Sequence, residues 1–300
     1  MTIYITLASH KMQLGDYKAE EKYPYHNEAC RKSCCELMQV WKESFQDEDE
    51  YIKMFFQNRF VPQNTVVAVY HDQIIGAAYL LPAELITEQG MKQVMFGYAL
   101  GVLKEYRGKG LGKRIIDFIC SYCEKMNYSF IFYPANERLV SYYESLGLSL
   151  AGYIKLLEYT CDFVSETDNL LLEDISAAHY ANLRNVFFNR NGFIKWEDAA
   201  IDYAIREIRY SGGFCNKLTV QSTECAVFGK VEKEKLNIME VAAPDHLVPV
   251  IVKGLSAHYK ALETSVYVPT DSPLNGRLIK WIMGYKIEPM LDGYCNLLLN

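Results

Sequence analysis

The sequence predicts a mixed α/β (α+β) protein of two tandem domains, each with a mixed, mostly antiparallel sheet flanked by helices. Three observations support this prediction. A glycine-rich turn at residues 97–112 joins an apolar strand to a helix. Alternating strand patterns precede this turn, and patterns with a helical period of 3.6 residues surround it. The second half of the chain then repeats the same order of patterns.

The composition is that of a globular protein with room for two domains. The chain has 300 residues, of which 50% are hydrophobic and 23% are charged. The formal net charge is −6 and the pI is about 5.6. A nucleic-acid-binding domain usually carries a basic surface. We therefore expect no nucleic-acid partner.

The cysteines and the apolar runs indicate the compartment. The N-terminus lacks a basic region followed by a long apolar segment, and no apolar run approaches the length of a membrane span. Nine cysteines are scattered through apolar segments, which is typical of buried thiols in a reducing compartment. Cys120 and Cys123 form one C-x-x-C pair on a predicted helix, with no second pair at metal-site spacing. We expect a cytoplasmic protein without a membrane partner and without a metal.

The first half opens with two helical patterns. From residue 26 onward the apolar side chains, Trp41 among them, recur on one side of a helix. Asp47 resembles an N-cap, and acidic residues fill the first turn of a second helix, which Pro62 terminates. We therefore expect helices over residues 26–45 and 47–60.

Strand patterns follow, up to the glycine-rich turn and its helix. Residues 65–70 alternate and are rich in valine, residues 71–73 form a turn, and residues 74–81 return as the second strand of a hairpin. The remaining predicted elements of this half are a strand over 94–103, a helix over 111–127, a strand over 129–133, a helix over 138–145 and a strand or strand pair over 148–159.

The glycine-rich turn has the composition of a phosphate-binding loop. Its glycines let backbone N–H groups approach an anion, and the helix N-terminus adds a partial positive charge. A P-loop needs a hydroxyl where this chain has Arg114, and a dinucleotide fingerprint needs a glycine where it has Lys113. The pattern Arg/Gln-x-x-Gly-x-Gly/Ala does fit, through Arg107, Gly110 and Gly112. The alternative is a glycine-rich turn that binds nothing.

This pattern resembles the pyrophosphate loop of the GNAT superfamily of acyl-CoA-dependent N-acyltransferases. A second family motif is also matched, namely Asn, a Tyr seven residues later, an acidic residue and Leu-Gly-hydrophobic. The chain supplies Asn136, Tyr143, Glu144, Leu146, Gly147 and Leu148. The order of elements is the GNAT order as well. We therefore identify residues 26–160 as similar to a GNAT domain.

The second half resembles a GNAT domain that has lost its cofactor loop. The predicted elements are helices over 173–191 and 197–210, a hairpin over 217–231, and then strand 236–242, helix 248–261 and strand 265–270. Residues 279–285 echo 142–148, and this offset of 137 residues places Pro244–Pro249 on Arg107–Gly112 and Lys280 on Tyr143.

We therefore expect a catalytic domain over residues 1–160 and a degenerate GNAT-like domain over residues 161–300. The tandem arrangement resembles the Eis-like acetyltransferases, without their C-terminal sterol-carrier-like domain.

The resemblance implies an N-acetyltransferase with acetyl-CoA as co-substrate. A primary amine of a small molecule or peptide attacks the thioester directly in a ternary complex, and a backbone N–H polarises the thioester carbonyl. The resemblance also implies that Asn136 bonds the pantetheine or positions the helix, and the alternative is a turn cap. The other implied cofactor contacts are Leu100, Gly101, Val102 and Leu103 along the pantetheine, and Arg107, Gly108, Lys109, Gly110, Leu111, Gly112 and Lys113 around the pyrophosphate.

Tyr143 is the candidate general acid. A thiol has a pKa of about 8.5 and a tyrosine of about 10, so Tyr143 can protonate the leaving thiolate; the alternative is a core tyrosine. No acidic residue lies on the strand over 94–103, and Glu84, Glu88 and a water chain stay open as the route for the amine proton. Two other functions also stay open, a non-catalytic acyl-CoA sensor and a transferase of longer acyl groups. The acceptor, the oligomeric state and the role of the second domain are not predicted.

Overall fold

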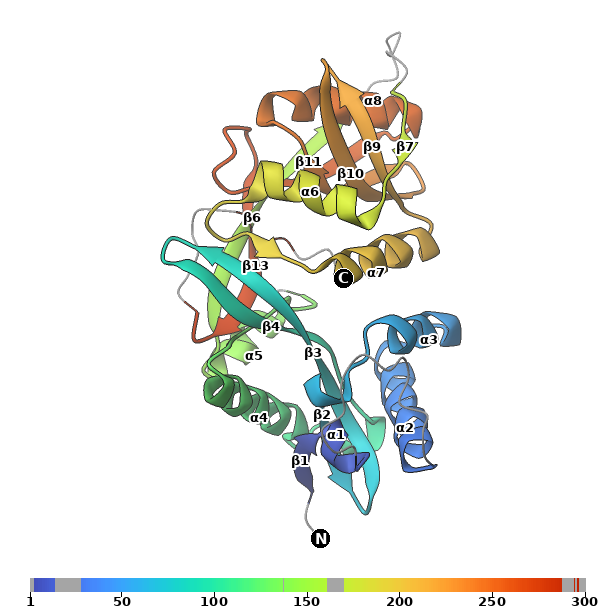
Figure 1. Cartoon of the computed structure of the whole chain (residues 1–300), viewed down its shortest axis with the longest axis vertical. Helices are drawn as coiled ribbons and strands as arrows, with labels where there is room; N and C mark the ends of the chain where they lie inside the picture. The colour runs from blue at the N-terminus through green and yellow to red at the C-terminus, as the bar shows by residue number, and fades with distance from the viewer. Residues whose placement is uncertain are drawn as a thin grey trace. The chain divides into compact units, whose positions relative to one another are not determined.

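The computed structural model describes residues 3–13, 28–136, 138–160, 170–287, 294 and 296. The chain divides into two compact units (Figure 1). Unit 1 consists of Met1–Pro82, Gln93–Ser149 and Met283–Ile287, and unit 2 consists of Ala83–Lys92, Leu150–Ile282 and Glu288–Asn300.

The division between the units differs from the boundary expected at residue 160. Strand β6 (Ser149–Thr160) pairs along its C-terminal half with β12 (Glu263–Val268), so nearly all of β6 belongs to unit 2. The mixed α/β class and the mostly antiparallel sheets flanked by helices are confirmed.

The sheet of unit 1 has the strand order β1-β2-β3-β4-β5, and the end of β13 (Arg277–Tyr285) adds to β5 in antiparallel fashion. The β1–β2 and β2–β3 pairs are antiparallel, whereas β4 and β5 are parallel. The bounds are β1 (Tyr4–Leu7), β2 (Thr65–Tyr70), β3 (Gln73–Thr87), β4 (Gly90–Val102) and β5 (Ser129–Phe132).

Strands β3 and β4 run further than the sequence predicts. Their shared tip, residues 83–92, belongs to unit 2, where Glu84 and Leu85 of β3 pair with β8 (Ile194–Lys195).

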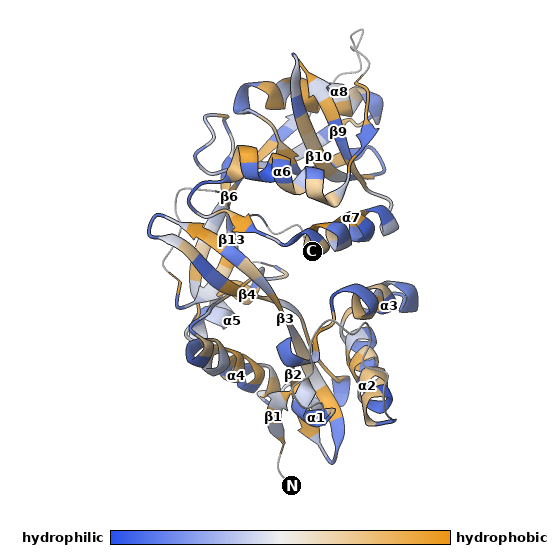
Figure 2. Ribbon diagram, viewed as in Figure 1, coloured by the Kyte–Doolittle hydropathy of each residue, from blue (hydrophilic) through white to orange (hydrophobic). Residues whose placement is uncertain are grey.

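Helices cover both faces of the unit 1 sheet (Figure 1). On one face, the Trp41 ring of α2 lies 5.2 Å from Tyr79 and 5.7 Å from Tyr98, centroid to centroid. On the other face Ile115 of α4 packs on β3, because a Cβ built at Gly76 would lie 3.2 Å from Ile115 Cδ1. The helices alternate between apolar and polar residues along their length, as amphipathic helices do (Figure 2). Unit 1 contains α1 (Ala8–Lys11), α2 (Glu28–Phe45), α3 (Asp49–Asn58), α4 (Leu111–Met126), α5 (Arg138–Ser145) and the 3₁₀ turns η1 (Pro62–Asn64) and η2 (Lys104–Tyr106).

Unit 2 has the strand order β6-β12-β11-β10-β9-β7, with only the β11–β12 pair parallel among its pairings with a described register. Apolar residues of α8, such as Ile251 and Leu255, join Ile238 and Val266 in the core on one face. Helices α6 and α7 lie on the other face, where the ring of Tyr180 stacks on Phe228. The further bounds are β7 (Glu173–Asp174), α6 (Ala177–Phe188), α7 (Asp198–Tyr210), β9 (Phe214–Val220), β10 (Thr223–Glu232), β11 (Lys235–Ala242), η3 (Asp245–Leu247) and α8 (Val248–His258).

The predicted repeat of element order is present. Each unit contains a hairpin whose two turn residues have positive φ, at 71–72 and at 221–222, as two-residue hairpin turns require. In each unit a third strand, a 3₁₀ turn, a helix and a parallel strand follow.

One predicted echo is wrong. Residues 142–145 are helical, whereas residues 279–285 lie in strand β13, whose end pairs with β5. Lys280 is therefore not a counterpart of Tyr143.

The strand registers also correct the predicted offset of 137 residues between the two halves. The parallel ladder ends at Gly97 in β4 and at Ile238 in β11, 141 residues further on. The turns η2 and η3 keep this spacing of 141, but α4 begins at Leu111 and α8 at Val248, only 137 residues further on. Between 3₁₀ turn and helix, unit 1 has four residues, Arg107–Gly110, and unit 2 has none. The loop is absent from unit 2 and has not been replaced by prolines.

Candidate active site

Strands β4 and β5 part in the middle of unit 1. Their parallel ladder ends at the pair Gly97 and Phe132, where β5 stops, while β4 continues to Val102. The backbone of β4 beyond Gly97 therefore runs on without β5 beside it. An unpaired strand edge can accept an extended chain as an added strand. This is the segment that contains the predicted pantetheine contacts Leu100, Gly101 and Val102.

Ala99 lies in β4, two residues beyond the end of the ladder with β5. Its φ is +49°, in the left-handed region that side chains with a Cβ rarely adopt. This conformation costs roughly 1–2 kcal/mol in an L-residue, and such strain gathers at functional sites. The strained backbone turns the peptide groups that precede Leu100. The sequence did not predict this feature, because alanine carries no signal for a left-handed conformation.

The end of β4 is fixed from both sides. A Cβ built at Gly101 would lie 2.4 Å from Ser44 Oγ, so the close approach of α2 requires a glycine there. The N–H of Leu103 donates to Ile75 O at 2.9 Å, and the Leu103 side chain is buried. Of the four predicted pantetheine contacts, Leu103 thus has its N–H engaged inside the sheet.

The glycine loop has the conformation that the sequence predicts for an anion cradle. Gly108 and Gly110 have φ of +74° and +75°, and a Cβ built on either would have no neighbour within 4 Å. The positive φ angles therefore explain why glycine occupies these two positions, since no neighbouring atom would clash with a side chain there. Gly110 is the N-cap of α4, and no side chain caps this helix end. The first-turn N–H groups of Leu111, Gly112 and Lys113 are therefore directed out of the helix with its partial positive charge.

The basic residues of the loop have different partners. Arg107 donates from Nε to Val102 O (2.8 Å) and from a terminal nitrogen to Glu43 O (2.9 Å). It therefore ties the loop to the end of β4 and to the last turn of α2. Lys109 Nζ lies 5.3 Å from the centroid of the Tyr106 ring, and Lys113 Nζ lies 3.3 Å from Asp117 Oδ1. These lysines keep positive charge beside the loop.

Tyr143 lies where the two strands part. Its ring packs edge-on against Phe132, the last paired residue of β5, with 4.5 Å between centroids. Burial raises the pKa of the Tyr143 hydroxyl above its ordinary value. The hydroxyl is therefore protonated at neutral pH and is chemically competent to donate a proton. Asn136 is exposed in the turn before α5, and its carbonyl accepts the N–H of Leu139 at 3.1 Å.

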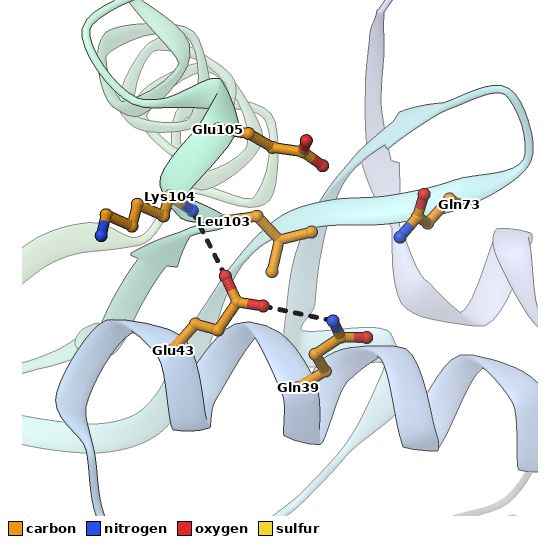
Figure 3. A pocket seen from close by; sticks show the side chains of 6 residues that line it. All are labelled: Gln39, Glu43, Gln73, Leu103, Lys104 and Glu105. Atoms are coloured by element: carbon orange, nitrogen blue, oxygen red, sulfur yellow. Dashed lines mark hydrogen bonds between the residues drawn. The ribbon is translucent and has the colours of Figure 1, made fainter.

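A polar cavity of about 470 Å³ adjoins the base of the loop (Figure 3). The Glu43 carboxylate accepts the Lys104 N–H at 3.4 Å and the Gln39 side-chain amide at 3.2 Å, which anchors η2 to α2. The ammonium group of Lys104 points away from Glu43 and Gln39 (Figure 3). The sequence did not predict this cavity, because its walls come from separate segments. The lining residues are Gln39, Glu43, Gln73, Leu103, Lys104 and Glu105.

Comparison with known proteins decides the family of this unit. Residues 31–148 match the model of the acetyltransferase (GNAT) family. This segment is a GNAT domain. The matched segment contains the glycine loop and Tyr143, so the predicted acyltransferase class is confirmed and the chemistry is acyl transfer. A search among curated proteins found no match.

Solved structures share the fold over most of the chain. A probable N-acyltransferase from Enterococcus faecalis is 12% identical with a TM-score of 0.64, over 96% of this chain and 73% of that one. Eis1 from Mycobacterium abscessus is 10% identical with a TM-score of 0.61, over 84% and 71%. A GCN5-related N-acetyltransferase from Kribbella flavida is 14% identical with a TM-score of 0.61, over 83% and 67%. At these identities the likeness establishes the fold alone.

Two kinds of feature, a helix that could span a membrane and a cluster that could hold a metal ion, are absent from the described residues. None of the helices in that part of the chain is both long enough and apolar enough to cross a membrane. No group of three or more His, Cys, Asp or Glu side chains in the same residues is arranged to hold a metal ion.

Proposed function

We propose that unit 1 is an N-acetyltransferase that moves the acetyl group of acetyl-CoA to a primary amine of a small molecule or peptide. The observation that carries this proposal is one continuous surface. The strand edge of β4 beyond Gly97, with the strained Ala99, leads through Leu103 and η2 into the uncapped glycine loop. The family match supports acyl transfer, and the loop supports a pyrophosphate-bearing donor.

The residues present fit acetyl-CoA as the donor. The open side of Gly108 and Gly110 leaves room for a phosphate against the N–H groups of the first turn of α4. The β4 backbone from Leu100 to Val102 would pair with the amide groups of the pantetheine arm. Asn136, exposed before α5, is placed to hydrogen-bond the same arm.

The reaction requires two proton movements around one acyl transfer. The amine nitrogen forms a bond to the acetyl carbon, and the bond from that carbon to sulfur breaks. A backbone N–H near Ala99 would stabilise the developing oxyanion, an effect of about 2.7–4 kcal/mol for one well-placed donor. Tyr143 gives its proton to the leaving thiolate. The amine proton leaves through a base that we do not assign, since the Glu84 carboxylate is already paired with Lys195 Nζ at 3.4 Å.

Unit 2, by contrast, is proposed as a degenerate GNAT-like domain without a cofactor site, because the four loop residues are absent. A cytoplasmic location is part of the same proposal. Cysteines of both units are free thiols, and burial raises the pKa of Cys34, Cys123 and Cys215 to about 12. Thiols held in this protonated form suit a reducing compartment.

The test is acetyl-CoA binding by calorimetry, followed by release of free thiol with a panel of amines. We expect binding by the wild-type chain and its loss in Gly110→Val, whose side chain would enter the space of the phosphate. Gly212→Val is the matched control, because Gly212 has a φ of +79° and equally open surroundings in unit 2. Binding without turnover on any amine would favour the acyl-CoA sensor. Absence of binding would refute both functions.

A further inference from the structure

We propose that Tyr142 is a cofactor-binding residue whose hydroxyl donates a hydrogen bond to the pyrophosphate of acyl-CoA. This inference rests on the proposed function, because it adds a contact to the same cofactor loop. It separates the roles of two neighbouring tyrosines on α5. Tyr143 donates a proton to the sulfur, and Tyr142 donates a hydrogen bond to the phosphates.

The position of the Tyr142 hydroxyl carries the inference. A Cβ built at Gly112 would lie 3.6 Å from Tyr142 Oη, so this hydroxyl reaches over the first turn of α4. Gly112 is the second residue of that helix, in the turn whose N–H groups no side chain caps. A phosphate oxygen sits about 3 Å from the N–H groups that hold it. A phosphate in the loop would therefore lie within reach of Tyr142.

The surroundings of Tyr142 leave its hydroxyl available. The residue is 43% exposed, which is high for a large aromatic side chain. Within the part of the chain that the structure describes, the hydroxyl has no hydrogen-bond partner. The ring itself is held, with its centroid 5.4 Å from that of Tyr143.

The chemistry of the contact is that of a neutral donor on an anion. A phenol O–H on a phosphate oxygen makes a charge-assisted hydrogen bond, which is shorter and stronger than a neutral one. It adds direction to a site where Lys109 and Lys113 supply only diffuse positive charge. A hydroxyl also makes its contact without the long flexible stem of a lysine.

The geometry of α5 explains why both tyrosines can reach the cofactor. Successive residues of an α-helix point about 100° apart. The ring of Tyr143 packs against Phe132 of β5, and that of Tyr142 turns toward α4. One turn of α5 would thus contact the donor at its phosphates and at its sulfur.

The test compares Tyr142→Phe with the wild-type chain. We expect the Kd for CoA to rise about tenfold, the loss of one hydrogen bond to a charged group. The inhibition constant of pantetheine, which has no phosphate, should not change. In turnover the KM for acetyl-CoA should rise with kcat unchanged, as for a contact made equally in ground and transition states. Tyr210→Phe is the control, an exposed tyrosine of similar accessibility (45%) on α7.

Any of three results would overturn this inference alone. The first is an equal Kd for CoA in the wild type and in Tyr142→Phe. The others are a parallel loss for pantetheine and a fall in kcat without a rise in KM, either of which would remove Tyr142 from the phosphates. A wild-type chain that fails to bind CoA would overturn the proposed function, and the inference with it.

Discussion

The two units part their parallel strands in the same way, but they differ in what the described residues place beyond the end of each ladder. In unit 1 the strand edge beyond Gly97 leads into the glycine loop. In unit 2 the residue that follows the ladder, Met239, has its carbonyl bonded by the Asn296 side chain at 2.9 Å. The Asn296 side chain thus bonds β11 just beyond its parallel ladder, in the part of unit 2 that corresponds to β4 beyond Gly97.

A buried network closes the same region of unit 2. The Glu240 carboxylate is fully buried and accepts Arg184 Nε at 2.7 Å, Tyr180 Oη at 2.7 Å and Tyr294 Oη at 2.8 Å. A buried ion pair is tolerated only when its remaining hydrogen bonds are made, as they are here. Under our proposal that unit 2 is degenerate, it differs from unit 1 in two places. No residues lie between η3 and α8, where unit 1 has its glycine loop, and polar groups of the protein bond β11 just beyond its ladder.

The largest expected effect comes from a substitution in the buried Arg184–Glu240 pair of unit 2. Arg184→Met should lower the free energy of unfolding by about 3–5 kcal/mol, because it leaves the Glu240 carboxylate buried without its counter-ion. Denaturant unfolding followed by circular dichroism measures the change. Asp202→Ala, which breaks the exposed Asp202–Arg206 pair, should cost under about 1 kcal/mol. Equal effects of the two substitutions would contradict this account of unit 2.

The second largest effect concerns Tyr143, which lies on α5. In the described part of unit 2, no helix lies between β12 and β13, so unit 2 has no counterpart of α5 there. Tyr143→Phe should lower kcat about a hundredfold, the low end of the range for a lost general acid, with the Kd for acetyl-CoA unchanged. Because burial raises the pKa of this hydroxyl, the donor stays protonated below pH 10, and its ionisation limits the rate only above that pH. A pH–rate profile checks the limb. An unchanged kcat would leave Tyr143 as a packing residue.

The smallest effect concerns the strained residue of the open site. Ala99→Gly should raise the free energy of unfolding by about 0.5–1 kcal/mol, since relief of the left-handed strain exceeds the entropic cost of a glycine. The same change should lower kcat modestly, because the peptide group aimed at the thioester becomes less fixed. Thermal unfolding and steady-state kinetics measure the two quantities. A loss of stability would show that the strain is not localised at Ala99.

Short sequence motifs predict part of the candidate site. Features that depend on residues far apart in the sequence were not predicted. The glycine loop, the helix after it and Tyr143 follow from short motifs, because glycine conformation and helix N-termini are determined by neighbouring residues. Ala99 escaped prediction, since its conformation is imposed by the parting of two strands. The Arg184–Glu240 pair joins residues 56 apart in the sequence, and neither carries a local sign of burial.

The second copy shows the same limit. The patterns predict its strands and helix, but the offset between the two copies depends on the predicted echo of residues 142–148 in residues 279–285, which lie in a strand. Only the strand registers show that unit 2 has no counterpart of the four residues Arg107–Gly110 between its 3₁₀ turn and its helix.

The path of β13 has a consequence for synthesis on the ribosome. Residues 283–285 supply the strand that pairs with β5, and the Lys286 carbonyl accepts the hydroxyl of Ser129. Unit 1 therefore completes its sheet only after residue 285 has been made, although most of its residues come first. A nascent chain of 160 residues would carry every predicted cofactor contact and still expose one edge of β5. For this protein, the sheet that carries the proposed cofactor contacts is expected to be complete only when residues 283–285 have been made.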